Sequence, residues 1–426
     1  MFNTVNFFSE LISESKAGKG TAICSVCSSS SYVIAAAIRH CKKTGRPLLV
    51  EATANQVNQY GGYTGMRPKD YIGFVNKIAG DMGFDPENII FGGDHLGPLV
   101  WCEEYEDAAM AKAEELVSEY AAAGFGKIHL DCSMRLGSDS KTAALSPSAI
   151  AGRAARLARI CESNLPEKRR KPVYVVGSEV PIPGGATSHE DMLAVTDPES
   201  MREELKLFEA AFLAEGLDDA WKRVIAIVVQ PGVEFGNNQV FLYDHGKAEK
   251  LAACAAGFEN IVMEGHSTDY QPDECLDKMK HDGIAILKVG PALTFAMRNA
   301  LFALEEIEKT VCSSSPSGLS DFSETLENAM LKNPKNWIKH YTGDDKTLAI
   351  MRKFSLSDRC RYYMDDESVR EAIARLFANI NKAEIPMGVI AQFFPRQCLE
   401  IVSGELKPTA ENLVYRQIEY VLDTYA

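Results

Sequence analysis

Residues 89–131 read IIFGGDHLGPLVWCEEYEDAAMAKAEELVSEYAAAGFGKIHLD. An apolar run at 89–94 is followed by an amphipathic stretch at 107–123 and then by a second apolar run at 127–131. Short apolar runs of this length predict buried strands, and the longer amphipathic stretch predicts a helix. The unit therefore predicts two parallel strands that are joined by a helical crossover.

The same alternation continues on both sides of this unit. Eight strands are predicted, at 21–26, 47–51, 89–94, 127–131, 173–179, 223–230, 260–264 and 285–290. Helix patterns lie between them, for example at 107–123, 146–163, 200–215 and 294–310. Eight parallel strands with helical crossovers in about 300 residues fit a closed (β/α)8 TIM barrel, for which roughly 250 residues are typical. An open, doubly wound sheet is the alternative.

Polar residues at the strand ends favour the barrel. Almost every predicted strand ends in one: Glu51, Asp94 and His95, Asp131, Glu179, Gln230, Glu264 and His266, and Lys288. An open sheet would concentrate its site at one switch point, whereas a barrel gathers the carboxyl ends of all its strands in one mouth. We therefore predict a single polar site at that mouth.

The character of the sequence changes near Cys312. The segment SSSPSGLSD at 313–321 has the composition of a linker, and no strand rhythm follows it. Helix patterns at 321–331, 366–379 and 411–425 have apolar faces that need a packing partner. We predict an α/β fold with a (β/α)8 barrel over residues 1–312 and a C-terminal helical extension, packed on the barrel, over residues 313–426.

Composition and charge argue against several classes of protein. The 426 residues include 46% hydrophobic and 24% charged residues, which fits a folded globular chain. With 45 Lys and Arg against 59 Asp and Glu, the formal net charge of −14 argues against a nucleic-acid partner. No apolar run approaches the roughly 20 residues of a membrane-spanning helix, and the N-terminus lacks the pattern of a signal peptide. A cytoplasmic location is expected.

The cysteines predict reduced thiols. Eleven of them are scattered without the regular spacing of a disulfide framework. Cys24 and Cys27 form a CxxC motif, but no second pair follows at zinc-ribbon spacing. This favours packed thiols over a metal or redox site at the motif.

Two histidines with neighbouring carboxylates are the candidate metal ligands. Asp94 and His95 are adjacent in GGDHLGP, and Glu264 and His266 are separated by one glycine in EGHSTDYQ. Two neutral imidazoles and a carboxylate, from Glu264 or Glu179, would suit Zn²⁺ or a similar divalent cation and leave a position open to a substrate oxygen. The alternative is a polar core whose hydrogen bonds are satisfied internally.

Five groups are candidates for proton transfer or catalysis. Asp94 and Glu179 are the candidate bases. His129 and Asp131 alternate on one face of the strand at 127–131, where they form either a proton relay or a charged layer that pairs with Lys288. Lys288 could also form a Schiff base with a carbonyl substrate, but surrounding carboxylates would raise its pKa and keep it charged.

The loop after the second strand has the composition of a polyol-binding site. It contains Glu51 and the amides of Asn55, Gln56 and Gln59, together with tyrosines and glycines. Amides offer both donors and acceptors to sugar hydroxyls. Gln230, at the end of the sixth strand, joins these candidates. The alternative is a turn rich in Asn and Gly that binds no ligand.

The loops after the last two strands predict a phosphosugar site. Loops in these positions commonly hold phosphate in a TIM barrel. Here they contain Ser267, Gly290 and Thr294, the last at the start of a predicted helix, and Asp269, which we assign to substrate binding. GKGT at 18–21 is not a P-loop, because the upstream glycine is missing and a strand follows.

Long blocks of the sequence resemble one known family. The blocks are ICSVCSS, VEATANQVNQYGGYTGM, GGDHLGP, GFGKIHLDCSM, GSEVPIPGG, RVIAIVVQPGVEF, EGHSTDYQ, AILKVGPALTFA, FSLSDRCRYY and EIPMGVIAQFFPRQ. From about residue 15 to the C-terminus, the chain closely resembles the GatZ/KbaZ family. Its members are the larger subunits of bacterial tagatose-1,6-bisphosphate aldolase, and an older description names some of them tagatose 6-phosphate kinases.

The resemblance implies a barrel similar to that of class II, zinc-dependent aldolases. By that similarity Asp94 would be the base, and His95 and His266 would be zinc ligands. At the sixth strand, however, this chain has QPGVE at 230–234 and no histidine. The candidates for a third ligand are then Glu179, Glu264 and Gln230, unless the classical aldolase site is incomplete.

Three functions follow from these observations. The main hypothesis is a subunit of a class II-type tagatose-1,6-bisphosphate aldolase in galactitol, tagatose or N-acetylgalactosamine catabolism. Such a subunit would bind a sugar or sugar phosphate and assemble with a separate catalytic class II subunit in an oligomer. The alternative, implied by relatives of the family, is a metal-dependent 4-epimerase of fructose and tagatose or their 6-phosphates. A kinase is disfavoured because no nucleotide-binding motif is present.

Overall fold

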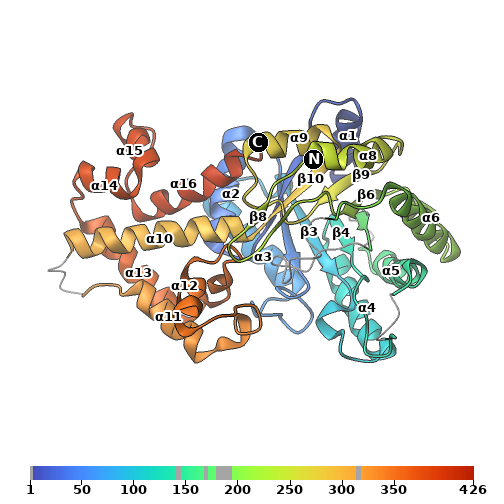
Figure 1. Ribbon diagram of the computed structural model, residues 1–426, viewed down its shortest axis with the longest axis horizontal. Coiled ribbons are helices and arrows are strands. Elements are labelled where there is room, and N and C mark those ends of the chain that lie inside the picture. Colours follow the sequence, from blue (N-terminus) through green and yellow to red (C-terminus); the bar gives the residue numbers. More distant parts are fainter. Residues whose placement is uncertain (1–2, 141–144, 167–170, 179–193, 313–317) are drawn as a thin grey trace.

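A closed barrel of parallel strands forms the centre of the molecule (Figure 1). The computed structural model describes residues 3–140, 145–166, 171–178, 194–312 and 318–426. The barrel strands are β1 (Ile23–Cys27), β2 (Leu48–Thr53), β3 (Ile89–Leu96), β4 (Lys127–Leu130), β5 (Val173–Val176), β6 (Val224–Val229), β9 (Val262–Gly265) and β10 (Ile284–Val289). Their order is β1-β10-β9-β6-β5-β4-β3-β2, and β2 pairs with β1 to close the barrel. The predicted TIM barrel is confirmed.

Helices cover the outside of the barrel. They are α2 (Ser31–Thr44), α3 (Pro68–Asp81), α4 (Glu106–Ala123), α5 (Pro147–Ser163), α6 (Pro198–Ala214), α7 (Asp218–Trp221), α8 (His245–Ala256), α9 (Asp273–His281) and α10 (Pro291–Val311), with short 3-10 turns η1 (Pro86–Asn88) and η2 (Pro98–Trp101). In α4, Glu106 and Asp107 suit the positive end of the helix dipole, and Gly124 ends the helix at φ 94°. The predicted helices therefore lie where the sequence pattern places them.

A short antiparallel hairpin adds to the predicted elements. Its strands are β7 (Glu234–Phe235) and β8 (Val240–Phe241), between β6 and α8. Two residues per strand are too few to show a periodic pattern in the sequence. The turn of the hairpin reaches the C-terminal part of the chain, where the Asn237 carbonyl accepts a hydrogen bond from the backbone N–H of Leu356 at 2.9 Å.

The amino-terminal end of the barrel interior is apolar. Helix α1 (Thr4–Lys16) contacts β6 and β10. Its Phe8 is completely buried and belongs to a cluster with strand side chains such as Ile23, Leu49 and Ile286. Burying apolar surface is favourable by roughly 25 cal/mol per Å². This end of the barrel is therefore a conventional hydrophobic core.

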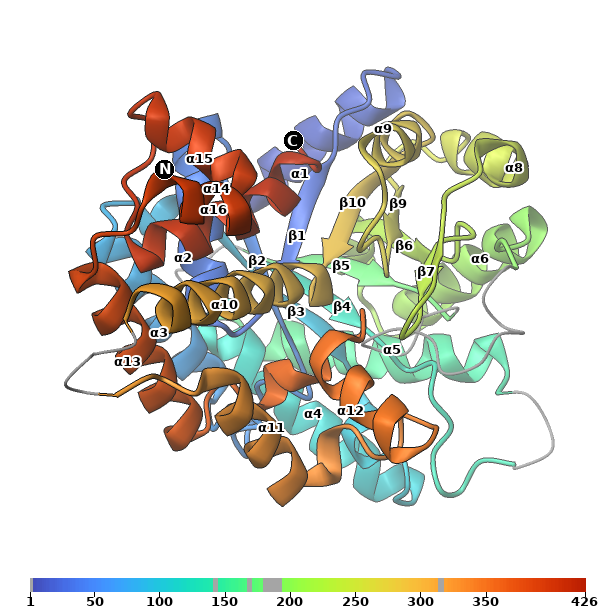
Figure 2. The ribbon, with the colours of Figure 1, turned by 60° about the vertical axis from the view of Figure 1, so that its left-hand side comes forward.

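The C-terminal helices form the predicted extension beside the barrel (Figures 1 and 2). They are α11 (Phe322–Lys332), α12 (Asp345–Phe354), α13 (Glu367–Lys382), α14 (Met387–Phe393), α15 (Pro395–Val402) and α16 (Ala410–Asp423), with the 3-10 turns η3 (Pro334–Asn336) and η4 (Arg359–Tyr363). Helix α16 packs against α10 and α2. The Tyr425 hydroxyl donates a hydrogen bond to the Thr268 carbonyl, in the loop after β9, at 2.8 Å. The extension is thus fastened beside the barrel mouth.

The predicted boundary between residues 312 and 313 remains a proposal. Residues 313–317 lie outside the described residues. Within the ranges given above, no helix combines the length and the apolar composition that crossing a membrane requires.

Candidate active site

Charged and imidazole side chains from five strands meet at the carboxyl end of the barrel interior. None of them is more than 5% exposed. They are Glu51 on β2, Asp94 and His95 on β3, Lys127 and His129 on β4 with Asp131 just after it, Glu264 on β9 with His266 just after it, and Lys288 on β10. We call this set the mouth cluster. Closure of the barrel brings together residues that are far apart in the sequence.

The end of β3 explains how two adjacent residues reach the same site. Successive side chains of a regular strand point to opposite faces. Here the register with β4 shifts between Gly93 and Leu96, and His95 adopts φ 47° in the left-handed region. Both Asp94 and His95 consequently line the same cavity. Backbone strain of this kind is concentrated at functional sites.

A glycine on β3 makes room for Glu51. A Cβ atom on Gly92 would lie 2.6 Å from the Glu51 Cγ atom, closer than non-bonded carbon atoms approach. The Glu51 carboxylate contacts both buried lysines, with Oε1 2.7 Å from Lys127 Nζ and Oε2 3.3 Å from Lys288 Nζ. The side chain therefore supports the mouth cluster from within instead of lining the cavity.

The two buried lysines pair with carboxylates. Lys127 Nζ also lies 2.8 Å from Glu264 Oε2, and Lys288 Nζ forms an ion pair with Asp94. Burial alone would lower the pKa of Lys288, but Asp94 and the other acidic groups outweigh it and raise that pKa well above its usual value. Lys288 stays an ammonium group. This favours its ion-pair role over a Schiff base, which needs a neutral amine.

The imidazoles of His95, His129 and His266 face one another. Their ring centroids are 5.1, 5.1 and 5.3 Å apart. Among the described residues, the buried Nε2 of His129 has no hydrogen-bond partner. One nitrogen of each ring lies beside a carboxylate: His95 Nδ1 at 2.8 Å from Asp131, His129 Nδ1 at 2.9 Å from Asp94, and His266 Nε2 at 2.9 Å from Glu264. A carboxylate on one nitrogen fixes an imidazole and leaves its other nitrogen for a metal ion.

Protonation states in the mouth cluster suit metal binding. Burial, helped by the charge of Lys288, lowers the pKa of His266 to about 3, and burial also lowers the pKa of His129. Burial opposes ionisation of Asp94, but His95 and Lys288 outweigh it and hold the pKa of Asp94 well below its usual value. Metal ions bind neutral imidazole and ionised carboxylate.

Four side chains of the mouth cluster could together hold a divalent metal ion. One donor atom from each of Asp94, His129, Glu264 and His266 lies within 4.8 Å of the others. Two nitrogen and two oxygen donors suit Zn²⁺ or a similar ion. The predicted ligand His95 borders this group, with its Nε2 3.7 Å from Asp94 Oδ2.

Charge supports the same fit. The mouth cluster has four carboxylates and two ammonium groups, so two negative charges remain when the imidazoles are neutral. Uncompensated buried charge is unfavourable by several kcal/mol. A divalent cation would neutralise the cluster. The donor set and the charge therefore both fit the predicted metal.

The CxxC motif does not form a paired site. Cys24 and Cys27 lie three residues apart in β1, so their side chains point to opposite faces of the strand. Cys27 lies near Glu51 and Asp94 in a second possible ligand group. Burial, however, raises the pKa of the Cys27 thiol well above its usual value, and a protonated thiol is a poor ligand.

The mouth cluster borders a cavity of about 950 Å³. A pocket of this volume accommodates a small ligand such as a sugar phosphate. The barrel loops contribute six of the predicted substrate residues to its wall: Asn55, Gln56, Ser267, Asp269, Gly290 and Thr294. The extension contributes residues from the segments 335–340 and 359–373. The structure thus brings most of the predicted site residues to one cavity.

Three predicted residues belong neither to the mouth cluster nor to the described wall of the cavity. The Gln59 amide donates a hydrogen bond to the Lys112 carbonyl at 2.9 Å. The Gln230 side-chain oxygen accepts hydrogen bonds from the backbone N–H groups of Gly232 and Val233 at 2.9 and 3.1 Å. Neither glutamine lines the cavity, because its amide is used to hold the backbone. Glu179 lies outside the described residues.

Asp131 and Asp269 have supporting positions. Asp131 binds His95 and accepts a hydrogen bond from the backbone N–H of Ser133 at 3.0 Å. One oxygen of Asp269 accepts hydrogen bonds from the N–H groups of Gly290 and Ala292 at 3.0 and 2.7 Å. The start of α10, where the sequence predicts a phosphate, therefore binds a carboxylate of the chain itself.

The sequence pattern misses two features of the site. It predicts a proton relay or a charged layer for His129, not a metal ligand, although the alternation of His129 with Asp131 indicates that His129 faces the barrel interior. Arg359 and Arg361 line the cavity, and their only sequence signal is their place in the block FSLSDRCRYY. The sequence does not say which part of the barrel that block reaches.

Comparison with known proteins identifies a family that matches nearly the whole chain. The sequence model described as D-tagatose-1,6-bisphosphate aldolase subunit GatZ/KbaZ-like matches residues 8–426. A crystal structure described as a probable tagatose 6 phosphate kinase from Sinorhizobium meliloti 1021 has 41% sequence identity and a TM-score of 0.87, over 95% of this chain and 99% of that chain.

Two aldolase structures are much less similar. The YdjI aldolase from Escherichia coli K12 has 10% identity and a TM-score of 0.42, over 88% of this chain and 98% of that chain. Fructose-bisphosphate aldolase from Campylobacter jejuni has 12% identity and a TM-score of 0.46, over 96% of each chain.

Proposed function

Because the chain belongs to the D-tagatose-1,6-bisphosphate aldolase subunit GatZ/KbaZ-like family, we propose that it is a subunit of such an aldolase whose own barrel binds a divalent metal ion and a ketose phosphate. One observation carries the proposal. A buried group of imidazoles and carboxylates borders a cavity large enough for the sugar. The mouth cluster to which this group belongs has two uncompensated negative charges when its imidazoles are neutral. A barrel that served only as a scaffold would have no need to bury these charges.

The metal ion would be held by His129, His266 and Glu264, with Asp94 or His95 beside them. Zn²⁺ fits this mixture of nitrogen and oxygen donors. When bound, such an ion polarises a carbonyl or hydroxyl oxygen of the substrate.

Other residues of the chain transfer protons, stabilise charge and bind the substrate. Asp94 lines the cavity and is ionised, so it is the group that accepts a proton from a substrate hydroxyl. Lys288 keeps its charge and lies against Asp94, where it stabilises negative charge on neighbouring oxygens. Asn55 and Gln56 line the same cavity and provide amide groups for sugar hydroxyls. Asp131 orients His95.

A ketohexose 4-epimerase is the second candidate. The observation that favours it is that three imidazoles and a candidate proton carrier, Asp94, come from one chain. Such a site needs no second subunit to complete it. Inversion at C4 could proceed by retro-aldol cleavage and re-addition, or by exchange of hydrogen at C4.

The kinase named in the description of the relative at 41% identity is not favoured. The sequence contains no GxxxxGK[ST] motif, and such a loop is what cradles nucleotide phosphates in P-loop kinases. A separate catalytic class II aldolase subunit remains the proposed protein partner, in keeping with the word subunit in the family description.

Metal analysis combined with product NMR tests the proposal. The chain purified alone should contain close to one divalent metal ion, and His266→Ala should lose at least about nine-tenths of it, since losing even a supporting hydrogen bond costs roughly 10–100-fold in metal affinity. His245→Ala is the control, because His245 is exposed and pairs with Asp282. Unchanged metal content in His266→Ala would reject the site.

The same samples separate the two functions. Fructose, tagatose and their phosphates are incubated with the chain alone and with a class II aldolase subunit, with and without EDTA. EDTA-sensitive inversion at C4 by the chain alone establishes the epimerase. Cleavage that appears only after the second subunit is added establishes the aldolase subunit, and absence of both reactions rejects the proposal.

A further inference from the structure

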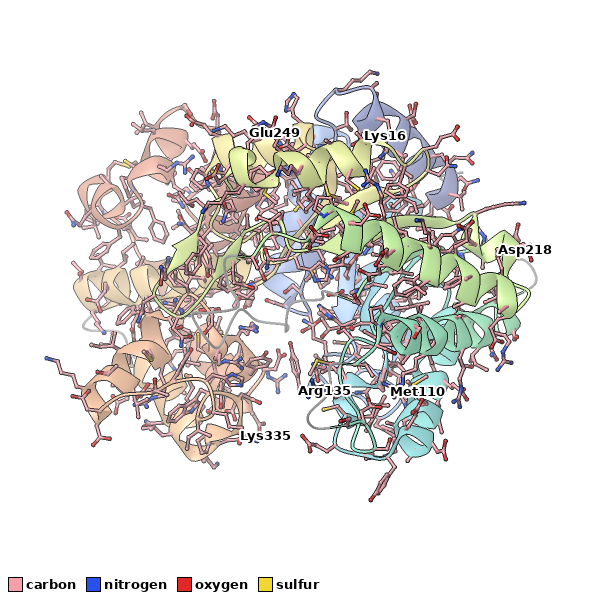
Figure 3. The ribbon with its side chains drawn as sticks, turned by 45° about the vertical axis from the view of Figure 1, so that its right-hand side comes forward. Lys16, Met110, Arg135, Asp218, Glu249 and Lys335 are labelled. Carbon is pink, nitrogen blue, oxygen red and sulfur yellow. The ribbon has the colours of Figure 1, made fainter. Side chains whose placement is uncertain are left out.

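The extension contributes a cationic wall to the cavity. Its five basic side chains there are Lys335, Lys339, Arg359, Arg361 and Arg370. Figure 3 shows Lys335 on the extension, away from Met110 and Asp218 on the outside of the barrel. Across the described part of the chain, none of the five lies within 4.0 Å of a carboxylate oxygen. The extension also contributes the carboxylate of Asp365 to this wall, which still leaves the wall positive although the whole chain has a formal net charge of −14.

Two of these cations have no counter-ion among the residues that the structure describes. Arg359 is 7% exposed, its Nη1 donates a hydrogen bond to the Asn336 carbonyl at 2.9 Å, and its buried Nε has no hydrogen-bond partner in the same part of the chain. Arg361 donates hydrogen bonds to the Asp358 carbonyl at 3.1 Å and to the Tyr362 hydroxyl at 2.9 Å. The nearby Asp358 carboxylate binds Arg298 instead, at 2.8 Å. A buried, unpaired guanidinium is unfavourable unless an anion binds it.

The start of α2 lines the same cavity and is also open to an anion. Residues 28–32 lie on the wall, and the Ser30 side chain at the N-cap makes no capping hydrogen bond. Free backbone N–H groups and the helix dipole favour an anion at such an end. Aromatic contacts hold this region to the extension, with ring centroids 5.7 Å apart for Tyr32 and Phe377 and 4.9 Å apart for Tyr63 and Tyr362.

The usual phosphate position is closed in this chain. TIM barrels commonly bind phosphate at the loops after the last two strands, and the second of these loops leads here into the start of α10. Asp269 already accepts hydrogen bonds from the N–H groups of Gly290 and Ala292 at that helix start. A phosphate dianion would have to approach this carboxylate. Like charges repel, so phosphate recognition moves to the cationic wall and the start of α2.

We infer that Arg359 and Arg361 of the extension, together with the start of α2, form the site that binds the phosphate group of the substrate. The inference rests on the proposed function, because it names the part of the ketose phosphate that the extension recognises. Two planar guanidinium groups match the oxygens of a phosphate dianion. The extension therefore makes the barrel selective for phosphorylated over free ketoses.

Calorimetric titration with inorganic phosphate tests the inference on the full chain. The unmodified protein should bind phosphate, and the double variant Arg359→Gln/Arg361→Gln should bind it at least about tenfold more weakly, since charge-assisted hydrogen bonds are the strong ones. Lys332→Gln is the matched control, because Lys332 is an exposed residue of the extension outside the cavity wall. Equal phosphate affinity in the double variant and the control would overturn the inference.

A folding defect would not leave the question open. Circular dichroism melting shows whether the arginine variants fold. If they do not, Lys335→Gln/Lys339→Gln decides, because both lysines are exposed residues of the same cationic wall and their charge attracts an anion to the two arginines. That variant should lose about threefold in phosphate affinity at low salt, since screened surface charges contribute less. Unchanged affinity in that variant would overturn the inference.

Kinetic measurements separate this inference from the proposed function. With a class II aldolase subunit present, the double arginine variant should raise KM for the ketose phosphate at least about tenfold, while Lys332→Gln leaves that KM within about twofold. If the unmodified protein turns over no ketose phosphate, either alone or with a class II aldolase subunit, but the variant loses phosphate binding, the function fails and the phosphate site stands. If the unmodified protein turns over a ketose phosphate under either condition and the variant retains the same KM for it, the phosphate site fails and the function stands.

Discussion

The two ends of the barrel interior are built from the same strands but differ in chemistry. At the amino-terminal end, Phe8 of α1 packs on apolar side chains such as Leu49 and Ile286. At the carboxyl end, the same strand β2 continues to Glu51, which is equally buried but pairs with Lys127. Apolar burial is favourable by itself, whereas buried charge is favourable only with a partner.

This difference shows which end of the barrel is built for stability and which for chemistry. The apolar end needs no ligand to be stable. The mouth cluster carries two uncompensated negative charges when its imidazoles are neutral, so a bound divalent cation would neutralise it. The predictions below test whether the two ends respond to substitution as this comparison requires.

Lys127→Met should have the largest effect on stability. Because Lys127 bridges Glu51 and Glu264 in a completely buried site, its loss leaves both carboxylates without this partner. The free energy of unfolding should fall by about 3–5 kcal/mol, measured by urea denaturation at pH 7. Lys16→Met is the control, since Lys16 donates one hydrogen bond to the Ala255 carbonyl and should contribute about 1 kcal/mol. Equal losses in the two variants would contradict the comparison.

Phe8→Ala should have the next largest effect, by a different mechanism. It leaves a cavity in the apolar end and should lower the free energy of unfolding by about 3–4 kcal/mol. Metal content per folded molecule should not change, because no ligand is touched. Leu399→Ala, at a site 73% exposed, should change stability by less than about 0.5 kcal/mol. Loss of metal in folded Phe8→Ala would show that the two ends are coupled.

Glu234→Gln should reveal a pH dependence that belongs to the mouth end. Burial raises the pKa of Glu234 from 4.5 to about 7. Between these values the folded chain binds more protons than the unfolded chain, so stability falls as pH rises through this window. The glutamine variant cannot ionise. Relative to the unmodified protein, it should therefore gain up to about 3 kcal/mol of stability between pH 5 and pH 8.

Urea denaturation at the two pH values measures this difference. Glu249→Gln is the control, because Glu249 is exposed on α8 (Figure 3). The control should show the same pH dependence as the unmodified protein. A pH dependence in Glu234→Gln that matches the control would mean that Glu234 is ionised in the folded protein at pH 5.

Much of the site was predictable because strand ends converge in a barrel. Asp94, Glu264, His266 and Lys288 are predicted site residues from their places at strand ends, and the structure brings them together. The glutamines were less predictable. Gln59 and Gln230 have the right chemistry for sugar binding, but backbone groups take up their hydrogen bonds. Composition of a loop does not say which of its polar groups are already satisfied.

The sequence alone determined the eight-stranded barrel and the position of its polar end, because strand and helix periodicities are local and the carboxyl ends of parallel strands share one face. Tertiary structure decided the rest. The register shift beside His95, the place of His129 among the possible ligands, the carboxylate of Asp269 at α10 and the cationic wall of the extension all depend on contacts between distant segments. Such contacts are set by packing and closure of the barrel, which no local pattern encodes.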